Sequence, residues 1–397
     1  MIKYDDVLHK CRWLVVVSMV FFSGPISAQS LPLDQLNLPA GFRIAVFAQV
    51  DNPRQLAVSK SGIIFAGSRK AGKVHALTDR DGDAYAETVT VLARGLTMPS
   101  GLAIHENDLY IAAVSDILKI SAIDQGLHPL EKPEVIYQDF PDKRHHGWKF
   151  IDFGPDGLLY VPVGAPCNIC LSENPVFASI QTLDVHAQPP VAETFASGVR
   201  NSVGFTWHPT TGHLWFTDNG RDMLGDGLPP CELNVASERG LHFGYPYIHA
   251  SSIADPDFGD KLGQLKTTAP ILELGPHVAP LGVEFYTGKQ FPQAYKHQLF
   301  IAEHGSWNRS RSAGHTGHRI SIARRTARGL VYETFIDGWL VDNKAWGRPA
   351  DILELADGSL LISDDKANVI YRVSYVGENI DRTQAVEITN NIGVSLQ

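Results

Sequence analysis

Two short segments carry residue types suited to acid–base and polar catalysis. His145 and His146 are adjacent in a segment flanked by Arg and Lys, and an imidazole serves as a general base near neutral pH because its unperturbed pKa is about 6.5. Arg200 and Asn201 are also adjacent, and they offer a planar fork of donors and a neutral amide to a ligand oxygen. Taken singly, either pair is more typical of a solvated loop.

A third segment is rich in oxygen ligands. Thr217–Asp222 and the following Pro229–Asn234 carry carboxylates, amides and free main-chain carbonyls, which suit Ca²⁺ because this ion takes about six to eight oxygen ligands. An Asx-rich surface loop is the alternative. Asp79–Asp83 and Glu87 resemble the opening of a calcium loop, but their spacing departs from the EF-hand pattern. A hairpin turn is predicted there, with structural Ca²⁺ as the alternative.

Three further segments combine aromatic, imidazole and guanidinium groups: Gly275–Pro280, His304–Arg309 and Trp346–Asp351. An aromatic ring beside an arginine can hold a planar, acidic ligand by stacking and ion pairing. Each segment directly precedes or follows a predicted strand, so the strands decide whether these groups meet.

A strand–turn–strand pattern occurs six times and determines the predicted fold. Short apolar strands alternate with turns that contain Gly, Asp or Asn, as in β-hairpins. Third strands follow several pairs, at Lys73–Leu77, Ile117–Ile120, Arg319–Ile322 and Val369–Val373. The six pairs are Gln55–Val58 with Ile63–Ala66, Gly101–Ile104 with Leu109–Ala112, Phe150–Phe153 with Leu159–Pro162, Gly204–Trp207 with Leu214–Thr217, Gly282–Phe285 with Leu299–Ala302, and Asp351–Glu354 with Leu360–Ser363.

Six such units predict an all-β, six-bladed β-propeller with the active site at one end of the central axis. Two β-sandwiches are the alternative, but they predict no sixfold repetition. His146 and Arg200 occupy the same relative place in successive blades, which puts both near the axis. Insertions at Gly220–Asn234 and Gly305–His318 mark the expected binding face.

Charge narrows the class of partner. The chain of 397 residues has 34 basic and 43 acidic side chains, a net charge of −9, and no basic cluster after its first dozen positions. Contact with nucleic acid needs clustered Lys and Arg. We therefore expect no nucleic-acid partner and a small neutral ligand instead.

The N-terminal segment is typical of an export signal. Basic residues precede an apolar run, Trp13–Phe22, and Ala28 supplies a small residue for a signal peptidase. The run is far shorter than the roughly 20 residues that span a bilayer. We predict a signal peptide at 1–28, cleaved near Ala28, and a single domain at 29–397 with its blades roughly at 40–380. The protein is expected to be periplasmic or secreted, with no stable membrane insertion.

Three of the four cysteines, Cys167, Cys170 and Cys231, lie outside the predicted signal. In an oxidising compartment a local Cys167–Cys170 disulfide is one outcome, with Cys231 unpaired or buried. The spacing alone does not decide whether the bond forms. Haem attachment is excluded at this segment, because Leu171 stands where that motif requires His.

Together these motifs resemble the soluble quinoprotein sugar dehydrogenases, which use pyrroloquinoline quinone (PQQ), and most closely their sorbosone dehydrogenase-like branch. The resemblance runs over roughly residues 40–375, nearly all of the predicted mature chain. It is carried by His145–Phe150, Phe153–Gly157, Gly164–Cys170, Gly198–Asn201, Thr217–Asp222, Glu232–Asn234, Gly244–Tyr247, His304–Arg309 and Arg348–Pro349.

The resemblance implies PQQ and Ca²⁺ at one end of the propeller axis. It implies that His146 takes the proton from the C1 hydroxyl or aldehyde hydrate of a sugar while hydride passes to PQQ. Arg200 and Asn201 would orient and polarise the ortho-quinone. Gly220 and Arg221 match residues whose main-chain carbonyls hold the Ca²⁺. The other cofactor contacts that it implies are Asn219, His277, Trp307, Arg309 and Arg348, with the two arginines as partners of PQQ carboxylates.

Three positions depart from the glucose dehydrogenase pattern. His145 replaces an acidic residue beside the base, no lysine is present near Gly305 and Ser306, and Cys231 occupies an acidic turn position. The first departure leaves the substrate open. The second leaves the cofactor contacts open, with His304 or Arg309 as substitutes for the lysine.

Three functions follow from these observations. The leading hypothesis is a PQQ-dependent dehydrogenase that oxidises an aldose or sugar aldehyde of the sorbosone or glucose type. Without a haem-attachment motif, its electrons would pass to a separate acceptor, a quinone or a cytochrome. A calcium-dependent lactonase would need carboxylates and Asn on an axial Ca²⁺, whereas His146, Arg200 and His277 are predicted to face the axis. A non-catalytic propeller that binds protein or glycan is the third.

Overall fold

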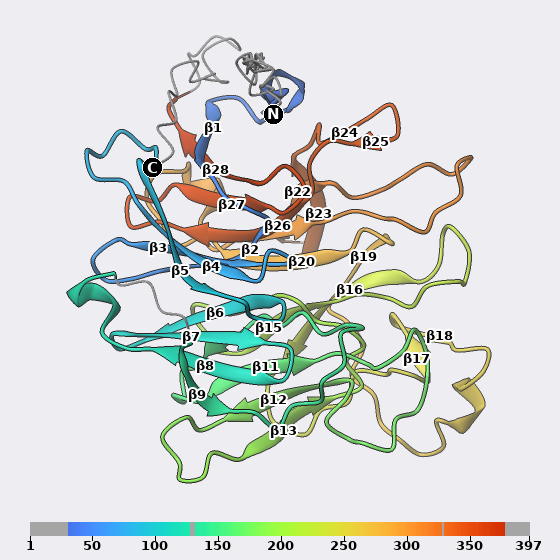
Figure 1. Ribbon diagram of the computed structural model, residues 1–397. Helices are drawn as coiled ribbons and strands as arrows, with labels where there is room; N and C mark the ends of the chain where they lie inside the picture. Colours follow the sequence, from blue (N-terminus) through green and yellow to red (C-terminus); the bar gives the residue numbers. More distant parts are fainter. Residues whose placement is uncertain (1–30, 128–131, 328, 378–397) are drawn as a thin grey trace, which may run out of the picture. The chain divides into compact units, whose positions relative to one another are not determined.

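The computed structural model describes residues 31–127, 132–327 and 329–377 (Figure 1). The chain divides into a unit of Met1–Leu31 and a unit of Pro32–Gln397, and all elements named below belong to the second. The predicted signal peptide at 1–28 lies outside the described residues. Within the described ranges, no helix is long and apolar enough to cross a membrane.

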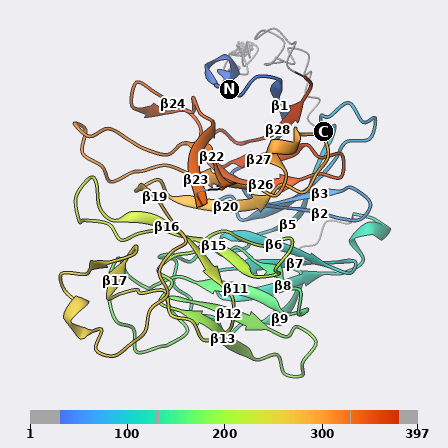
Figure 2. The same cartoon turned by 180° about the vertical axis from the view of Figure 1, so that it is seen from behind.

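The second unit is a six-bladed β-propeller built from six four-stranded antiparallel sheets (Figures 1 and 2). Two short ribbons, β17 (Ile248–His249) with β18 (Ile253–Ala254) and β24 (Leu340–Val341) with β25 (Lys344–Ala345), lie outside the blades. Short 3₁₀ helices occur at Leu33–Gln35, Ile123–Gln125, Gly259–Lys261 and Gln293–Tyr295. From the innermost strand outward, the blades are β2 (Pro53–Val58), β3 (Ile64–Ser68), β4 (Lys73–Thr78) and β5 (Thr88–Arg94); β6 (Pro99–His105), β7 (Asp108–Ala113), β8 (Asp116–Ile120) and β9 (Glu134–Tyr137); β10 (Asp152–Phe153), β11 (Leu159–Val163), β12 (Ser179–Leu183) and β13 (Ala192–Ser197); β14 (Phe205–Trp207), β15 (Leu214–Asp218), β16 (Pro230–Ala236) and β19 (Leu272–Pro276); β20 (Pro280–Phe285), β21 (Leu299–Glu303), β22 (Arg319–Thr326) and β23 (Gly329–Ile336); and β26 (Pro349–Glu354), β27 (Leu360–Asp364), β28 (Val369–Tyr375) and β1 (Phe42–Gln49).

The six predicted strand pairs are the two inner strands of the six blades, so the propeller prediction is confirmed. Two strands are shorter than predicted: β14 begins one residue late, at Phe205, and β10 has only two residues. The larger difference is at β10. Beside it, Ile151 bonds to the side chain of Gln55 from the first blade, which donates to its oxygen at 2.8 Å and accepts from its N–H at 3.0 Å. A side-chain amide therefore replaces part of the expected ladder.

The ring is closed by the first strand of the unit. β1 pairs antiparallel with β28, from Phe42 opposite Tyr375 to Gln49 opposite Val369. The last blade therefore takes its outer strand from the start of the unit, and both ends of the propeller sequence are held in one sheet.

The hydrophobic core lies between neighbouring blades. The second strands are buried along their whole length, for example β11 and β21, except that β7 begins with the half-buried Asp108. This burial arises because each sheet is covered on both faces by its neighbours. One cluster joins Phe65 and Leu92 of the first blade to Leu102 and Ile111 of the second. Burying one such side chain contributes roughly 1.5–3 kcal/mol.

Chain direction decides where the loops gather. In each blade the innermost strand begins, and the second strand ends, at the same end of the sheet, because the two strands are antiparallel. Loops that enter a blade and loops between its second and third strands therefore share one end of the propeller. The predicted insertions after β15 and β21 are both of the second kind.

The acidic segment at Asp79–Asp83 forms the turn between β4 and β5, as predicted. Its carboxylates accept main-chain N–H groups of the turn, including those of Gly82 and Ala84, which both bond to Asp79. Ligand oxygens of Asp79, Asp81, Asp83 and Glu87 all lie within 4.8 Å of one another. Calcium binding at this turn stays a prediction.

Candidate active site

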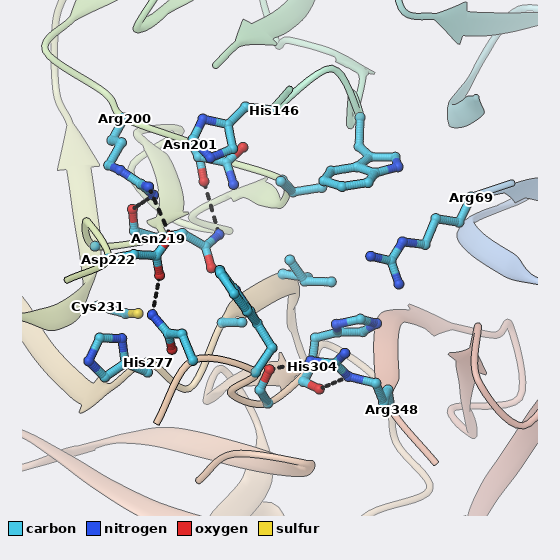
Figure 3. A pocket seen from close by; sticks show the side chains of 18 of the residues that line it. Arg69, His146, Arg200, Asn201, Asn219, Asp222, Cys231, His277, His304 and Arg348 are labelled. Atoms are coloured by element: carbon cyan, nitrogen blue, oxygen red, sulfur yellow. Dashed lines mark hydrogen bonds and ion pairs between the residues drawn. The ribbon is translucent and has the colours of Figure 1, made fainter. Parts of the chain in front are cut away.

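A cavity of about 420 Å³ opens at the end of the propeller where the inner strands begin (Figure 3). Residues from every blade except the second contribute to its wall. The lining residues are Arg54, Arg69, His145, His146, Trp148, Arg200, Asn201, Val203, Asn219, Gly220, Asp222, Cys231, His277, Ala279, Leu281, His304, Gly305, Trp307, Asn308 and Arg348.

His146 lies in the loop that enters the third blade. Its φ of 51° is in the left-handed region, which residues with a side chain rarely adopt. Nδ1 lies 2.9 Å from the main-chain oxygen of Ala165. Because a carbonyl oxygen only accepts, Nδ1 carries the proton and Nε2 keeps its lone pair. Burial, and then the charges of Arg200 and His145, lower the pKa of His146 to about 2. The ring therefore stays in its proton-accepting form at neutral pH.

Arg200 is buried and its guanidinium is held by two asparagines. Nε and Nη2 donate to the main-chain oxygen and Oδ1 of Asn168, at 2.9 and 2.8 Å, and Nη1 donates to the main-chain oxygen of Asn219 at 2.9 Å. A guanidinium has five N–H donors. One N–H on each terminal nitrogen therefore remains for a ligand, with Asp222 Oδ2 3.6 Å from Nη2.

Asp218 fixes the main chain of the same loop. Its two carboxylate oxygens accept the backbone N–H groups of Arg200 and Asn201, at 2.7 and 2.6 Å. Burial raises the pKa of Asp218 to about 6, although these hydrogen bonds oppose the shift. The cavity-lining pair Arg200–Asn201 is thus anchored by a carboxylate at the end of β15.

Asn201 has an unused acceptor. Asn219 donates through Nδ2 to the main-chain oxygen of Asn201 at 2.9 Å (Figure 3). The Oδ1 atom of Asn201 is buried and has no hydrogen-bond partner among the described residues. Buried polar atoms nearly always have a partner, so this oxygen is available to a cation or a donor in the cavity.

The other side of the cavity is strongly basic. Arg54 and Arg69 share one carboxylate, with Nη1 atoms 3.0 and 3.4 Å from Asp365 Oδ2. Arg348 donates from Nε to the main-chain oxygen of His304 at 2.7 Å and from Nη2 to that of the next residue. Within the described ranges, no carboxylate oxygen lies within 4.0 Å of its guanidinium. Burial lowers the pKa of Arg348 to about 10, so the group is still a cation at neutral pH. The wall carries more positive than negative charge and suits an anion.

Two indole rings line the cavity, and one of them, Trp148, lies beside the basic wall. The guanidinium carbon of Arg69 lies 5.0 Å from the ring centroid of Trp148, and that of Arg54 lies 5.9 Å away. Trp307 is 66% exposed, so it lies at the rim. Both rings offer an apolar face to a flat ligand.

The loop after β15 contributes the oxygen-rich side. Gly220 lines the cavity, whereas the side chain of Arg221 is turned to an ion pair with Asp255. His277, with φ 59°, lies with Nε2 2.8 Å from the main-chain oxygen of Gly225 in the same loop. Burial raises the pKa of the Cys231 thiol to about 11, so Cys231 presents a neutral thiol to the cavity.

Sequence comparison agrees with this geometry. The family model described as Glucose / Sorbosone dehydrogenase matches residues 112–306. An uncharacterized protein of Borreliella burgdorferi is 34% identical over 385 residues, covering 94% of this chain and 99% of that protein. The chain belongs to the glucose/sorbosone dehydrogenase family. As a member of this family it is an oxidoreductase.

Two further comparisons concern one protein of Coprinopsis cinerea. A pyrroloquinoline quinone-dependent pyranose dehydrogenase of Coprinopsis cinerea is 24% identical over 352 residues, covering 75% of this chain but 46% of that protein. This chain thus spans about half of that relative's length. The solved holo form of the PQQ domain of Coprinopsis cinerea pyranose dehydrogenase has a TM-score of 0.69 and 17% identity, covering 85% of this chain and 97% of that domain. At this identity the likeness shows the fold.

Most of the predicted site residues of this chain line one cavity. The cavity brings together His146, Arg200, Asn201, Asn219, Gly220, His277, Trp307 and Arg348. Arg309 is not among the lining residues: its Nε donates to the main-chain oxygen of Gly314 at 2.7 Å, within its own loop. Arg221 does not line the cavity either, and its side chain faces Asp255, so only its main chain is left for the predicted role.

The cavity also contains two arginines of the first blade that the sequence did not single out, Arg54 and Arg69. Asp222 and Asn308, from two of the predicted segments, meet in it through a side-chain hydrogen bond. The available signal for the two arginines was their position in the first blade. Arg54 is the second residue of an inner strand and Arg69 directly follows a second strand, and both places lie at the end of the propeller where the cavity opens.

Cys167 and Cys170 form a disulfide, and Cys231 is free and buried. Of the two outcomes left open by the sequence, the structure has the bonded one.

Proposed function

We propose that this oxidoreductase is a PQQ-dependent dehydrogenase that oxidises an aldose or sugar aldehyde of the sorbosone or glucose type. The observation that carries the proposal is one cavity that joins a neutral histidine, with its Nε2 unprotonated, to a wall of arginines. The first group suits proton abstraction and the second suits an acidic cofactor.

The residues present fit PQQ, a planar tricarboxylate with an ortho-quinone. Arg54, Arg69 and Arg348 supply cationic donors for carboxylates, and Arg69 Nε is buried with no partner among the described residues. Trp148 and Trp307 supply flat apolar surfaces. PQQ, when bound, supplies the hydride acceptor that the chain's own side chains lack.

Calcium fits the opposite, oxygen-rich side. Gly220 and Arg221 would hold it through main-chain carbonyls, as the family resemblance implies. The unpartnered Oδ1 of Asn201 and the carboxylate of Asp222 add oxygens of the type that Ca²⁺ prefers. The support for calcium is chemical, because a bound cation would satisfy the unpartnered Oδ1 of Asn201.

The roles of the chain's residues follow from their hydrogen bonds. Ala165 fixes the His146 tautomer, so Nε2 accepts the proton from the C1 hydroxyl or aldehyde hydrate of the sugar. The two unused N–H groups of Arg200 stabilise negative charge that develops on an oxygen beside them. Asp218 and Asn219 hold Arg200 and Asn201 in place, so little reorganisation accompanies the reaction.

We further propose a periplasmic or secreted location and a separate electron acceptor, a quinone or a cytochrome. The predicted signal at 1–28 and the Cys167–Cys170 disulfide support export, because such bonds persist in oxidising compartments.

Reconstitution tests the proposal directly. The purified protein is titrated with PQQ and Ca²⁺, and absorption and dye reduction are followed with a panel of aldoses and sugar aldehydes. We expect a changed PQQ spectrum and sugar-dependent dye reduction that needs both additions. Neither signal with any sugar would remove the dehydrogenase assignment, and hydrolysis of lactones without PQQ would favour the lactonase.

A further inference from the structure

The Cys167–Cys170 disulfide closes a four-residue loop beside Arg200, which lines the cavity. The two Cα atoms are 6.2 Å apart, and both cysteines are half-buried. Between them lies Asn168, which is neither a predicted site residue nor a lining residue of the cavity. Its contacts lead directly to Arg200.

Every polar group of the Asn168 side chain is engaged. Oδ1 accepts from Arg200 Nη2 and from the backbone N–H of Asp222, both at 2.8 Å, and Nδ2 donates to the main-chain oxygen of Asp222 at 3.0 Å. The main-chain oxygen of Asn168 accepts from Arg200 Nε at 2.9 Å. Asn168 therefore supplies two of the three acceptors that orient the guanidinium and ties it to the loop of Asp222.

The loop itself is held at its two ends by one tyrosine. The Tyr245 hydroxyl accepts the backbone N–H of Cys170 at 3.0 Å and lies 3.5 Å from Cys167 Sγ. Tyr245 is buried. With the disulfide closed, the segment has few ways to move, and a polar atom fixed in this way orients its partner.

We propose that Asn168, held by the Cys167–Cys170 disulfide, is a positioning residue for Arg200. Removing the Asn168 amide leaves Arg200 Nη2 without its acceptor, and opening the disulfide lets the whole segment, with its main-chain oxygen, move away from the guanidinium. The catalytic consequence rests on the proposed function, whereas the structural consequence does not.

The first experiment needs no cofactor. In protein labelled with ¹⁵N-arginine, the Arg200 Nη2–H signal, assigned with Arg200→Lys, should exchange slowly with water. In Asn168→Ala we expect this signal to exchange at least about tenfold faster, because Oδ1 of Asn168, the acceptor of Nη2, is lost. Asn168→Asp keeps a side-chain acceptor and should restore most of the protection. Asn174→Ala, at an exposed position between β11 and β12, is the matched control and should leave the Arg200 exchange rate unchanged.

The second experiment addresses the disulfide, which is the only one within the described residues. Reduction by a phosphine yields two thiols, while the phosphine becomes its oxide with oxygen from water. Reduced wild type and Cys167→Ser/Cys170→Ser should both show the faster Arg200 exchange, and the phosphine should change nothing further in the double variant. Arg200 protection that survives in all of these variants overturns the inference.

Kinetics with PQQ and Ca²⁺ then separate the two proposals. In an active wild type, Asn168→Ala should lower kcat by about 10- to 100-fold, as expected for a misplaced catalytic group, with much less change in KM. An unchanged kcat together with faster Arg200 exchange limits the role of Asn168 to structure and overturns the positioning role. An inactive wild type overturns the proposed function, while the exchange measurement still decides whether Asn168 holds Arg200.

Discussion

His146 combines an unfavourable backbone conformation with a fixed tautomer. A Cβ atom on Gly164 would lie 2.6 Å from the Cβ of His146, so a glycine is required opposite the histidine. The main-chain oxygen of Ala165, the residue after Gly164, accepts the hydrogen bond from His146 Nδ1. One short segment therefore gives the imidazole room and also sets which nitrogen faces the cavity. A residue that is held in a left-handed conformation by such contacts is typical of a functional site.

Replacing His146 by Ala should slow the chemical step and leave cofactor binding intact. We expect kcat to fall by about 10²- to 10⁴-fold, the usual contribution of a general base, because the Nε2 atom that accepts the substrate's proton is removed. PQQ titration by absorption and steady-state dye reduction measure the two quantities. His186→Ala, at an exposed position outside the cavity, should behave as wild type. Full turnover by His146→Ala would show that another group is the base.

Replacing Arg348 by Gln should weaken PQQ binding. The guanidinium has no carboxylate partner within the described ranges, so its positive charge is available to an acidic ligand. Loss of one charged hydrogen bond of about 1.5–3 kcal/mol corresponds to a roughly 10- to 150-fold higher Kd for PQQ. Isothermal titration measures it, with exposed Arg325→Gln as the control. An unchanged Kd would place the PQQ carboxylates elsewhere.

At the scale of elements, the sequence predicts pairing between residues that are near one another in the chain and misses pairing between residues that are far apart in it. Short apolar strands with polar turns predict the inner strands, because each hairpin is formed by neighbouring residues. β1 was not predicted as part of the last blade, since Phe42 pairs with Tyr375 across nearly the whole unit. Arg54 and Arg69 were missed for the same reason: they join the cavity only when the first blade meets the last.

Replacing Phe42 by Ala should weaken the closure of the ring. Phe42 is 1% exposed, and its ring centroid lies 4.7 Å from that of Phe291 and 5.0 Å from that of Phe335, both in the neighbouring fifth blade. Truncation leaves a cavity at this seam, so the free energy of unfolding should fall by about 3–5 kcal/mol. Denaturant unfolding measures it, and Gln49→Ala, exposed on the same strand, should change it little. Equal stability of the two variants would mean that the seam does not depend on Phe42.

At the scale of the whole molecule, buried ionisable groups make stability depend on pH in two opposite ways. Burial lowers the pKa of His304 to about 3 and of His318 to about 4, so their contributions are lost as the pH falls below 6.5. Burial raises the pKa of Asp351 to about 7 and of Glu232 to about 8. These acids are protonated in the folded chain and ionised in the unfolded chain, so their contributions are lost as the pH rises toward 8.

Glu232 gives the last prediction. Between its unfolded pKa, near 4.5, and its folded pKa of about 8, the folded chain binds one more proton at this site, so stability falls with rising pH by up to about 1.4 kcal/mol per unit. Above pH 6.5, His304 and His318 no longer oppose this fall in stability.

Glu232→Gln mimics the protonated acid. Asn234 donates to Glu232 Oε2 at 3.0 Å and has an unpartnered Oδ1. If the Asn234 side-chain amide flips, its Oδ1 can accept a hydrogen bond from the NH₂ group of the new Gln side chain. The variant should therefore gain stability over wild type progressively from pH 6.5 to 8. Denaturant unfolding across this range measures the difference, with the exposed Glu238→Gln as the control. Parallel pH profiles of wild type and Glu232→Gln would show that Glu232 is ionised in the folded protein.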